Sequence, residues 1–559
     1  MELYTLFTNG IIYLAIAVFV RHSLYRYRYM LQMFQQAGYK THEYVKWLSR
    51  SFFSKVVTPE HIYFNILILI LTYFISDHIT LTSGAIIIGI FSLFWFINTS
   101  RYNPEKEKKP IVYTPRMIRL AVPGLILLFF FWLALIDFGG RLLQFRDFAE
   151  PFVDRDPYFL SFGLVMIDIF VPAVVWAMGW VLKPVEKYVH NSFKRQAKKK
   201  LASMPELKVV AITGSYGKTS TKFAIDTFLN ERYNVCTTPG SYNTPMGICK
   251  VVNNQLEAGH SVLILEMGAR YKGNIEELCK LATPDISVVT NVGIAHLETF
   301  GSKKTIAWEK GALARRLKPG GTLILNGDDP LVSQMGSDRD DITRIFVGDS
   351  GSIRAANIEA GADGTSFEME WMDEEGELVQ SQIVRTQLLG RHNIQNLLLA
   401  AGVARELGLR PETIAIAATK LEPVEHRLEL KQRGGLTVID DAFNSNPVGA
   451  KNAVEILSEF SGGRKFIITP GMIELGELEE EKNKELGRDI GKSKIDTVLL
   501  VGKERTKPIL EGIQSTPEGR VKDVRVVDSL FEANDILEAE AEDGDVVLYE
   551  NDLPDSYNA

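Results

Sequence analysis

Residues 208–221 read KVVAITGSYGKTST, a short β-branched run followed by a glycine turn and a Lys-Thr pair. A helical pattern follows from Lys222. Strand, glycine turn and helix in this order are typical of a mononucleotide-binding unit, because the backbone N–H groups of the turn close on phosphate and the helix N-terminus adds partial positive charge. Lys218 is then expected to contact the β- and γ-phosphates, and the Thr219 hydroxyl to bind magnesium. Ile212 stands where the strict GxxxxGK[ST] pattern has its first glycine, so the loop is a shorter variant.

Alternating strand and helix patterns continue after this loop. Apolar runs at 262–266, 286–290 and 322–325 are typical of buried parallel strands, and helical patterns lie at 274–282 and 306–317. This alternation predicts a doubly wound α/β sheet that binds ligands at the carboxyl ends of its strands. Alternating polar and apolar residues at 354–385 predict an inserted β-hairpin.

A second, smaller α/β domain is predicted to begin near Val424. Strand-like runs lie at 466–469, 497–501 and 546–549, and a charged helical stretch lies at 478–490. The pattern is again one of strands alternating with helices, which favours a parallel sheet.

The first 200 residues are much more apolar than the rest. Five runs, at 3–20, 62–76, 81–99, 120–138 and 159–182, approach the roughly 20 apolar residues that a membrane-spanning helix requires. Buried core helices are the alternative for each run. Lys and Arg gather after the first, third and fifth runs, which predicts an outside N-terminus and a cytoplasmic C-terminal half.

Two features of this region have open roles. The basic segments 21–55 and 183–200 either lie on the inner leaflet or act only as topology determinants. Asp168 lies inside the fifth run. It is either a functional intramembrane acid or a residue that pairs within the helix bundle.

Composition excludes several classes of protein. The net charge of -7 carries no overall nucleic-acid footprint, so no nucleic-acid partner is expected. The three cysteines, Cys236, Cys249 and Cys279, form no CxxC pair. Their spacing argues against a disulfide framework and against a thiolate zinc site.

Seven ordered motifs run through the second half of the chain. After the phosphate loop they are TPGSYNTPMG at 238–247, LEMGA at 265–269, TNVGIAHLE at 290–298 with Lys310 fourteen residues after His296, GRHNIQN at 390–396, EHRL at 425–428 and IDDAFNSNP at 439–447. Their order and spacing resemble the Mur ligase family, and most of all its D-alanyl-D-alanine-adding branch. The resemblance covers roughly residues 208–555.

The resemblance implies an ATP-dependent amide-bond ligase of peptidoglycan synthesis that uses ATP and Mg²⁺. In such an enzyme a carboxylate attacks the γ-phosphate of ATP, and an amine then opens the acyl phosphate. Together with the apolar runs, the resemblance predicts a helical membrane domain with about five spans over residues 1–200, a central ATP-binding α/β domain over 201–423 and a smaller C-terminal α/β domain over 424–559.

The resemblance also assigns site residues. The expected catalytic residues are Lys218, His296 and Lys310. The expected ATP-binding residues are Gly214, Ser215, Gly217, Lys218, Thr219, Ser220, Asn393, Asn396, Arg427 and Asp441. The expected metal ligands are Thr219, Glu266, His296 and, if it is carbamylated, Lys310. Glu266 and His296 are expected at the ends of neighbouring strands. Taken singly, Glu266 is typical of a strand-end acid, His296 of a loop histidine and Lys310 of a solvated helix charge.

Two departures from the family concern the substrates. Five apolar runs replace the N-terminal domain that holds the UDP-sugar in soluble Mur ligases, so the carboxylate acceptor is either lipid-linked or UDP-linked, and the membrane is either a partner in substrate capture or an anchor. The family's Lys-Gly-Ser near the last strand is replaced by ENDLPD at 550–555, which indicates an altered amino substrate. The expected location is the bacterial inner membrane, with the catalytic domains in the cytoplasm.

Other functions remain as alternatives. A membrane scaffold or nucleotide sensor with a degenerate ligase domain is disfavoured by the joint presence of Lys218, Thr219, Glu266, His296 and Lys310. A ligase of a different envelope polymer, such as poly-glutamate, matches the motifs less well. The amidating Mur-like subunit usually carries a four-cysteine zinc site, which three scattered cysteines do not supply. An ATP-driven transporter would need a signature loop and a strand ending in paired acids, and the sequence has neither.

Overall fold

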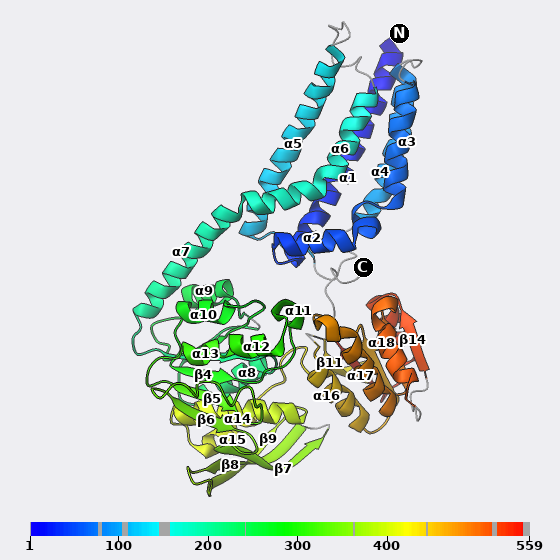
Figure 1. Ribbon diagram of the computed structural model, residues 1–559. Helices are drawn as coiled ribbons and strands as arrows, with labels where there is room; N and C mark the ends of the chain where they lie inside the picture. Colours follow the sequence, from blue (N-terminus) through cyan, green and yellow to red (C-terminus); the bar gives the residue numbers. More distant parts are fainter. Residues whose placement is uncertain are drawn as a thin grey trace. The chain divides into compact units, whose positions relative to one another are not determined.

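The computed structural model describes the chain except for residues 1, 76–80, 103–109, 145–156, 241, 362–363, 443–444, 517–522 and 552–559. The described chain separates into two compact units, Met1–Val189 and His190–Asp552 (Figure 1). Each unit has its own interior.

The first unit is built from helices. In chain order they are α1 (Glu2–Gln36), α2 (Thr41–Arg50), the π-helical turn η1 (Phe52–Val56), α3 (Pro59–Ile75), α4 (Leu81–Thr99), the short η2 (Ser100–Tyr102), α5 (Pro115–Gln144), α6 (Pro157–Val181) and the start of α7 (Lys183–Ala202). Helix α1 packs against α4 and α6, and α5 packs against α6. The five predicted apolar runs lie in α1, α3, α4, α5 and α6.

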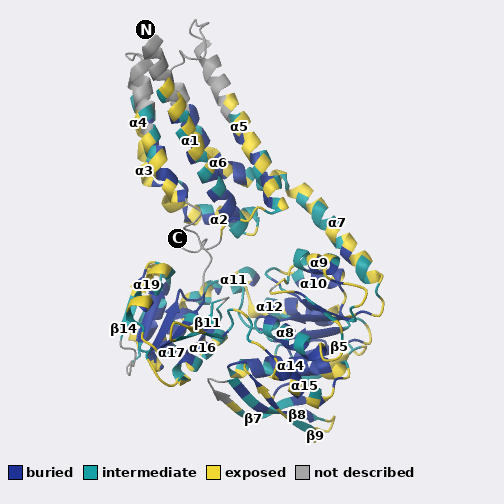
Figure 2. Cartoon of the chain, turned by 180° about the vertical axis from the view of Figure 1, so that it is seen from behind, coloured by how far each residue is buried: buried dark blue, intermediate teal, exposed yellow. Residues whose placement is uncertain are grey.

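Apolar side chains lie on the inside and on the outside of this unit. Its interior is rich in aromatic residues, and Trp95, Phe34 and Tyr44 are almost completely buried. Figure 2 shows exposed residues along α3 and α5. Exposed large hydrophobic side chains on α3 to α6 include Ile66, Ile70, Leu93, Phe96, Ile126, Phe130, Phe170 and Trp180.

Length and composition single out one membrane-span candidate among the described residues. Gly163–Val181 is long and apolar enough to cross a bilayer, and Pro59–Leu71 is a shorter apolar helix. The structure therefore establishes a helical N-terminal unit, while five spans stay a prediction.

The second unit contains two sheets. Its described residues form a first sheet with the order β2-β3-β1-β4-β5-β6-β7-β8-β9. The strands are β1 (Lys208–Thr213), β2 (Val235–Thr237), β3 (Val262–Glu266), β4 (Ile286–Val289), β5 (Thr322–Asn326), β6 (Thr343–Val347), β7 (Ile353–Gly361), β8 (Gly364–Met372) and β9 (Leu378–Thr386). Strands β2 to β6 pair in parallel, which confirms the predicted α/β architecture of this domain.

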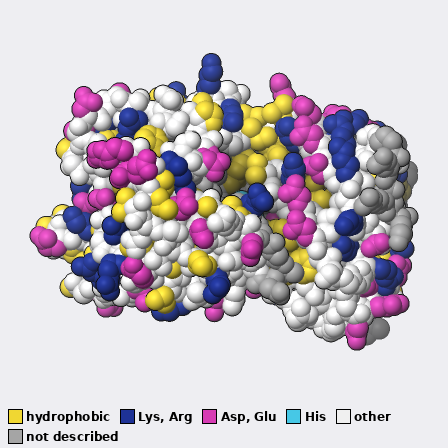
Figure 3. Space-filling model, turned by 90° about the horizontal axis from the view of Figure 1, so that it is seen from below, with side chains coloured by type: hydrophobic (Ala, Val, Ile, Leu, Met, Phe, Trp, Pro, Cys, Tyr) yellow, Lys and Arg dark blue, Asp and Glu magenta, His cyan; other side chains and the backbone are white. Residues whose placement is uncertain are grey.

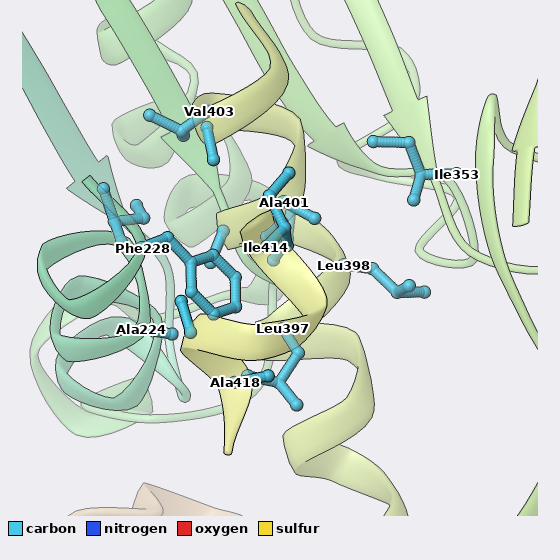
Figure 4. Close-up of a cluster of buried hydrophobic side chains, with 14 of the residues drawn as sticks. Ala224, Phe228, Ile353, Leu397, Leu398, Ala401, Val403, Ile414 and Ala418 are labelled. Atoms are coloured by element: carbon cyan, nitrogen blue, oxygen red, sulfur yellow. The ribbon is translucent and has the colours of Figure 1, made fainter. Parts of the chain in front are cut away.

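Helices cover both faces of the parallel strands. They are α8 (Lys218–Leu229), α9 (Pro245–Asn254), α10 (Asn274–Leu281), α11 (Leu297–Phe300), α12 (Lys303–Lys310), α13 (Ala312–Arg315), α14 (Arg391–Glu406) and α15 (Pro411–Ala418). Successive side chains of a strand point to opposite faces. Ile264 accordingly joins the core around α8 and α14, whereas Leu265 joins the core around α9 and α10. Figure 4 shows the first of these cores, where Phe228 of α8 and Ile414 of α15 lie beside α14.

Two predictions about this domain need correction. The inserted hairpin is a meander of three strands, β7, β8 and β9, which pair antiparallel and extend the main sheet. Alternation of polar and apolar residues indicates strands but does not show where one strand ends and the next begins. The turn at 373–377 therefore went unrecognised within the predicted hairpin. Helix α8 begins at Lys218 rather than at Lys222.

The C-terminal domain has its own sheet. Its described strands are β10 (Glu429–Arg433), β11 (Leu436–Asp441), β12 (Lys465–Thr469), β13 (Thr497–Val501), β14 (Asp523–Val527) and β15 (Val546–Glu550), in the order β10-β11-β15-β12-β13-β14. Its helices are α16 (Pro447–Glu459), the short η4 (Gly476–Leu478), α17 (Glu479–Lys492), α18 (Lys503–Gln514) and α19 (Leu530–Glu540). All pairings except β10–β11 are parallel, which confirms the predicted second α/β domain.

On the face of the molecule seen in Figure 3, basic and acidic side chains are interspersed among hydrophobic ones.

Candidate active site

The loop between β1 and α8 has the backbone that phosphate binding requires. Gly217, the residue before the helix, has a left-handed φ of 77°. A Cβ atom on Gly217 would lie 2.4 Å from Asn396 Oδ1, so only glycine fits. Asn291 Oδ1 accepts the Tyr216 backbone N–H at 2.9 Å and fixes the loop from the next strand connection. The free N–H groups at the start of α8 therefore face a cavity with a preset shape.

Lys218 and Thr219 occupy the first turn of α8. Lys218 Nζ donates to the carbonyl oxygens of Gly214 at 2.9 Å and Ser215 at 3.1 Å. Burial lowers the pKa of Lys218, and the Glu266 carboxylate opposes that shift. Thr219 Oγ1 donates to Glu266 Oε2 at 2.9 Å. One predicted phosphate contact and two predicted metal ligands thus lie together at the carboxyl ends of β1 and β3.

A cavity of about 270 Å³ opens over this loop. Both domains of the second unit contribute to its walls. The predicted nucleotide residues that line it are Ser215, Gly217, Lys218, Thr219, Ser220, Asn393, Asn396, Arg427 and Asp441. Gly214, at the start of the loop, does not line the cavity. It packs against Thr290, whose Oγ1 would lie 1.9 Å from a Cβ atom at this position.

The far walls of the cavity are polar and tied to the loop. Asn396 accepts from Thr221 Oγ1 at 3.2 Å and donates to Asn393 Oδ1 at 3.0 Å. Arg427 NH2 reaches Thr219 Oγ1 at 3.5 Å. Burial, reinforced by the nearby Glu550 carboxylate, raises the pKa of Asp441 to about 8. Asp441 therefore titrates near neutral pH, and its protonated form can donate a hydrogen bond to a ligand oxygen.

Lys310 is buried at the end of α12, in contrast to an ordinary solvated helix lysine. Burial, together with the charge of Lys218, lowers the pKa of Lys310 to about 7. The neighbouring Glu309 accepts the backbone N–H groups of Gly273 and Ile275, both at 2.7 Å, and so holds this end of the helix in place. A large part of the Lys310 population is then the neutral amine, which is the form that reacts with carbon dioxide.

His296 is placed differently from the prediction. Strand β1 lies between β3 and β4, so Glu266 and His296 do not follow neighbouring strands. A doubly wound sheet puts its first strand in the centre, and chain order therefore does not reproduce spatial order. His296 precedes α11 with a φ of 59°, and its Nδ1 lies 2.5 Å from Glu474 Oε2.

Glu474 is a contact residue that the sequence did not reveal. It lies in the loop GMIELG at 471–476 of the C-terminal domain, and its φ of 63° is unusual for a side-chain-bearing residue. Its second oxygen, Oε1, accepts from Arg270 NH2 at 2.6 Å. One carboxylate thus ties the C-terminal domain to the His296 and Arg270 loops of the central domain.

Lys222 is a second residue that the sequence analysis passed over. Its side chain is fully buried, and Nζ donates to the carbonyl oxygens of Thr238, at 2.6 Å, and Gly240. The same nitrogen lies 3.7 Å from Glu266 Oε2. Lys222 stands one helical turn after Lys218, and that spacing is the signal that could have revealed it.

Replacing Lys222 with methionine is expected to cost about 3–5 kcal/mol of unfolding free energy, because Glu266 would stay buried without its cation. Urea unfolding of the purified chain measures the loss. Lys420→Met is the matched control, since Lys420 forms a partly exposed 2.6 Å pair with Glu231 and should contribute less than about 1 kcal/mol. Equal effects of the two substitutions would contradict a supporting role for Lys222.

The acidic residue near the last strand points inward. Glu550 is completely buried. Its carboxylate accepts hydrogen bonds from the hydroxyls of Ser445 and Thr469, and the bond from Thr469 is 2.6 Å long. Asn551 follows with a φ of 68° and donates to the Gly471 carbonyl at 2.6 Å. Glu550 therefore links the Ser445 loop to the end of β12 and is not presented to a substrate. The rest of that predicted motif, at 552–555, lies outside the described residues.

The donor set fits a magnesium nucleotide. The carboxylate of Glu266 and the hydroxyl of Thr219 offer the oxygen ligands that Mg²⁺ prefers. Positive charge around the cavity comes from the ammonium group of Lys218, the guanidinium of Arg427 and the N-terminus of α8. Fold and cavity together define an α/β mononucleotide-binding enzyme whose second domain completes the nucleotide site.

Comparison with known proteins identifies the family. Residues 212–404 match the Mur ligase middle domain, and residues 426–549 match the Mur ligase, glutamate ligase domain. The UDP-N-acetylmuramoyl-tripeptide--D-alanyl-D-alanine ligase of Bacillus subtilis is 32% identical over 345 residues, which are 61% of this chain and 72% of that protein. The same-named ligase of Mycobacterium bovis is 34% identical over 363 residues, or 61% and 70% of the two chains.

Solved structures agree. MurF from Acinetobacter baumannii superposes with a TM-score of 0.58 at 24% identity, over 65% of this chain and 77% of that one, and supports the fold. MurF ligase from Thermotoga maritima in complex with ADP gives a TM-score of 0.56 at 27% identity, over 65% and 80% of the two chains. The chain belongs to the Mur ligase family and is an ATP-dependent amide ligase.

Proposed function

We propose that this ligase joins an amino substrate to a carboxylate on a peptidoglycan-type precursor, with D-alanyl-D-alanine as the first amine to test. The observation that carries the proposal is the single cavity in which the phosphate loop meets Asn393, Asn396, Arg427 and Asp441. The names of the relatives support this substrate class. The burial of Glu550 is compatible with D-alanyl-D-alanine, because this residue of the acidic replacement adds no charge at a substrate surface.

Five residues around the phosphate loop have roles in the proposed reaction. Lys218 and Arg427 neutralise charge on the transferred phosphoryl group, while Thr219 and Glu266 would hold Mg²⁺. A carbamylated Lys310 would add a further carboxylate-like ligand. The enzyme mainly positions groups and stabilises charge as the substrate carboxylate attacks the γ-phosphate, since phosphoryl transfer needs little covalent help from protein. The amine then displaces phosphate from the acyl phosphate.

The test is phosphate release by the full-length enzyme in detergent. The assay supplies ATP, Mg²⁺, D-alanyl-D-alanine and a muramoyl tripeptide in either UDP-linked or lipid-linked form. Turnover that requires both the carboxylate and the amine is expected, and mass spectrometry should detect the pentapeptide product. Turnover without either substrate, or none with any pair, would instead favour the nucleotide sensor or scaffold.

We further propose that the first unit anchors the enzyme in the bacterial inner membrane with five spans. The exposed large apolar side chains on α3 to α6 support this proposal, because exposing so many of them to water is unfavourable. The basic segments after the first, third and fifth runs support a cytoplasmic position for the ligase domains.

Cysteine labelling tests this topology. The native cysteines are buried, so a cysteine introduced as Lys55→Cys at an exposed position should dominate labelling. In intact cells a membrane-impermeant maleimide is expected to label a cysteine placed before Glu2 but to label Lys55→Cys only after permeabilisation. Labelling of both positions in intact cells, or release of the chain by alkaline carbonate, would contradict the five-span topology.

A further inference from the structure

Polar side chains meet in the aromatic interior of the first unit. They are His22 and Arg26 of α1, His61 of α3, Tyr102 of η2 and Asp168 of α6, and each is at most 3% exposed. Burial of so many polar groups is costly unless their hydrogen-bonding and charge requirements are met. The ligase chemistry uses none of them, and they lie in a different unit from the phosphate loop.

Hydrogen bonding fixes the tautomer of His22. The hydroxyl of Thr99 donates its only hydrogen to the Trp95 carbonyl at 2.8 Å, so Thr99 Oγ1 acts as an acceptor toward His22 Nδ1 at 3.3 Å. Nδ1 therefore carries the hydrogen, and Nε2 of the neutral ring presents a lone pair. That lone pair lies 3.4 Å from Asp168 Oδ1, and both atoms are buried without a hydrogen-bond partner. Two acceptors that face each other in a dry interior require a cation between them.

The distances favour a metal ion over a proton. A charge-assisted N–H···O bond is about 2.7–2.9 Å long. His22 Nε2 lies 3.4 Å from Asp168 Oδ1, and His61 Nε2 lies 3.4 Å from the other oxygen, Oδ2. Two ligands of one tetrahedral zinc ion, with bonds of about 2.0–2.2 Å, are separated by about 3.4 Å. The ligand atoms of all three residues lie within 4.8 Å of one another. We propose that His22, His61 and Asp168 bind a zinc-class divalent transition-metal ion that joins α1, α3 and α6.

Arg26 shapes this site from the side. Its NH1 lies 3.1 Å from Asp168 Oδ2 and 3.4 Å from His61 Nε2, and its NH2 donates to the Val56 carbonyl at 2.8 Å. This partner on Oδ2 holds the carboxylate in orientation, so that Oδ1 faces His22 Nε2 and Oδ2 faces His61 Nε2. The guanidinium also adds positive charge, so the fourth ligand is expected to be hydroxide or another anion. Two imidazoles favour zinc-class ions over Mg²⁺, which separates this site from the ligase metal.

Metal content tests the proposal on the full-length, tag-free chain in detergent. After expression with zinc and dialysis against metal-free buffer, plasma mass spectrometry is expected to find about one zinc ion per chain. His22→Phe and His61→Phe keep an aromatic ring but remove the nitrogen donors, and each should lower the content at least 10-fold. His42→Phe is the matched control, because His42 is 58% exposed and lies outside the cluster. It should leave the content unchanged.

Cobalt provides a second measurement that does not depend on the variants folding. Co²⁺ added to the metal-free wild-type chain is expected to give the intense visible absorption of four-coordinate N/O ligation. Absence of both bound zinc and this absorption would overturn the proposal and leave a proton shared between His22 and Asp168. Zinc content unchanged in both histidine variants would also overturn it. Because neither readout uses ligase turnover, a failure here is distinguishable from a failure of the proposed function.

Discussion

Lys218→Ala is expected to abolish ATP-dependent turnover, with a loss of at least about 10³-fold in kcat. Lys218 Nζ already lies among the loop carbonyl oxygens of Gly214 and Ser215, at the edge of the cavity where a terminal phosphate would sit. Alanine removes a positive charge that the other groups around the cavity cannot move to replace. Phosphate release in the presence of carboxylate and amine measures the effect.

The control for this variant lies on the adjoining strand. Lys208 begins β1, is exposed and is ten residues from Lys218, so Lys208→Ala should retain wild-type activity. Similar unfolding midpoints for the two variants would show that lost turnover comes from the site and not from the fold. Normal turnover in Lys218→Ala would remove the phosphate-loop assignment.

Local patterns explain why much of the fold was predictable. β3 and β13 have the bounds that the sequence predicted, because both are nearly continuous apolar runs, the pattern of strands buried on both faces. The phosphate loop was predictable for the same reason, since strand, glycine turn and helix are adjacent in the chain. Hydropathy likewise located the helices of the first unit, although it did not show that His22, His61 and Asp168 meet inside them.

Features that depend on distant pairing were not predictable. The position of β1 between β3 and β4 follows from the winding of the whole sheet, and it was missed because chain order was taken as spatial order. The contact between His296 and Glu474 joins residues 178 positions apart in different domains. Lys222 and Lys310 have ordinary helix environments in the sequence, and only burial in three dimensions distinguishes them from surface lysines.

The second large effect is expected for Lys310→Ala. If the buried Lys310 amine reacts with carbon dioxide, the resulting carbamate places negative charge beside the metal, and alanine would remove it. We expect about 10- to 100-fold lower turnover, the size of effect seen when a metal site loses a supporting group. Lys304→Ala, on the exposed face of the same helix, should be unaffected. Full activity of Lys310→Ala without any addition would contradict this role.

Chemical rescue and pH separate a carbamate from a simple ammonium. Formate or acetate is expected to restore part of the activity of Lys310→Ala, because a small carboxylate can occupy the space left by the side chain.

A pKa of about 7 for Lys310, instead of about 10.5, raises the neutral fraction of its amine at pH 7 by roughly 10³-fold, and only this neutral form adds carbon dioxide. As pH falls below 7 the amine becomes protonated, so wild-type activity should decline on the acid side unless carbon dioxide is raised. The carboxylate-rescued variant should keep its activity to lower pH, since acetate and formate stay ionised there. An acid limb that is identical in the wild type and the rescued variant would place the titrating group elsewhere, with Asp441 as the next candidate.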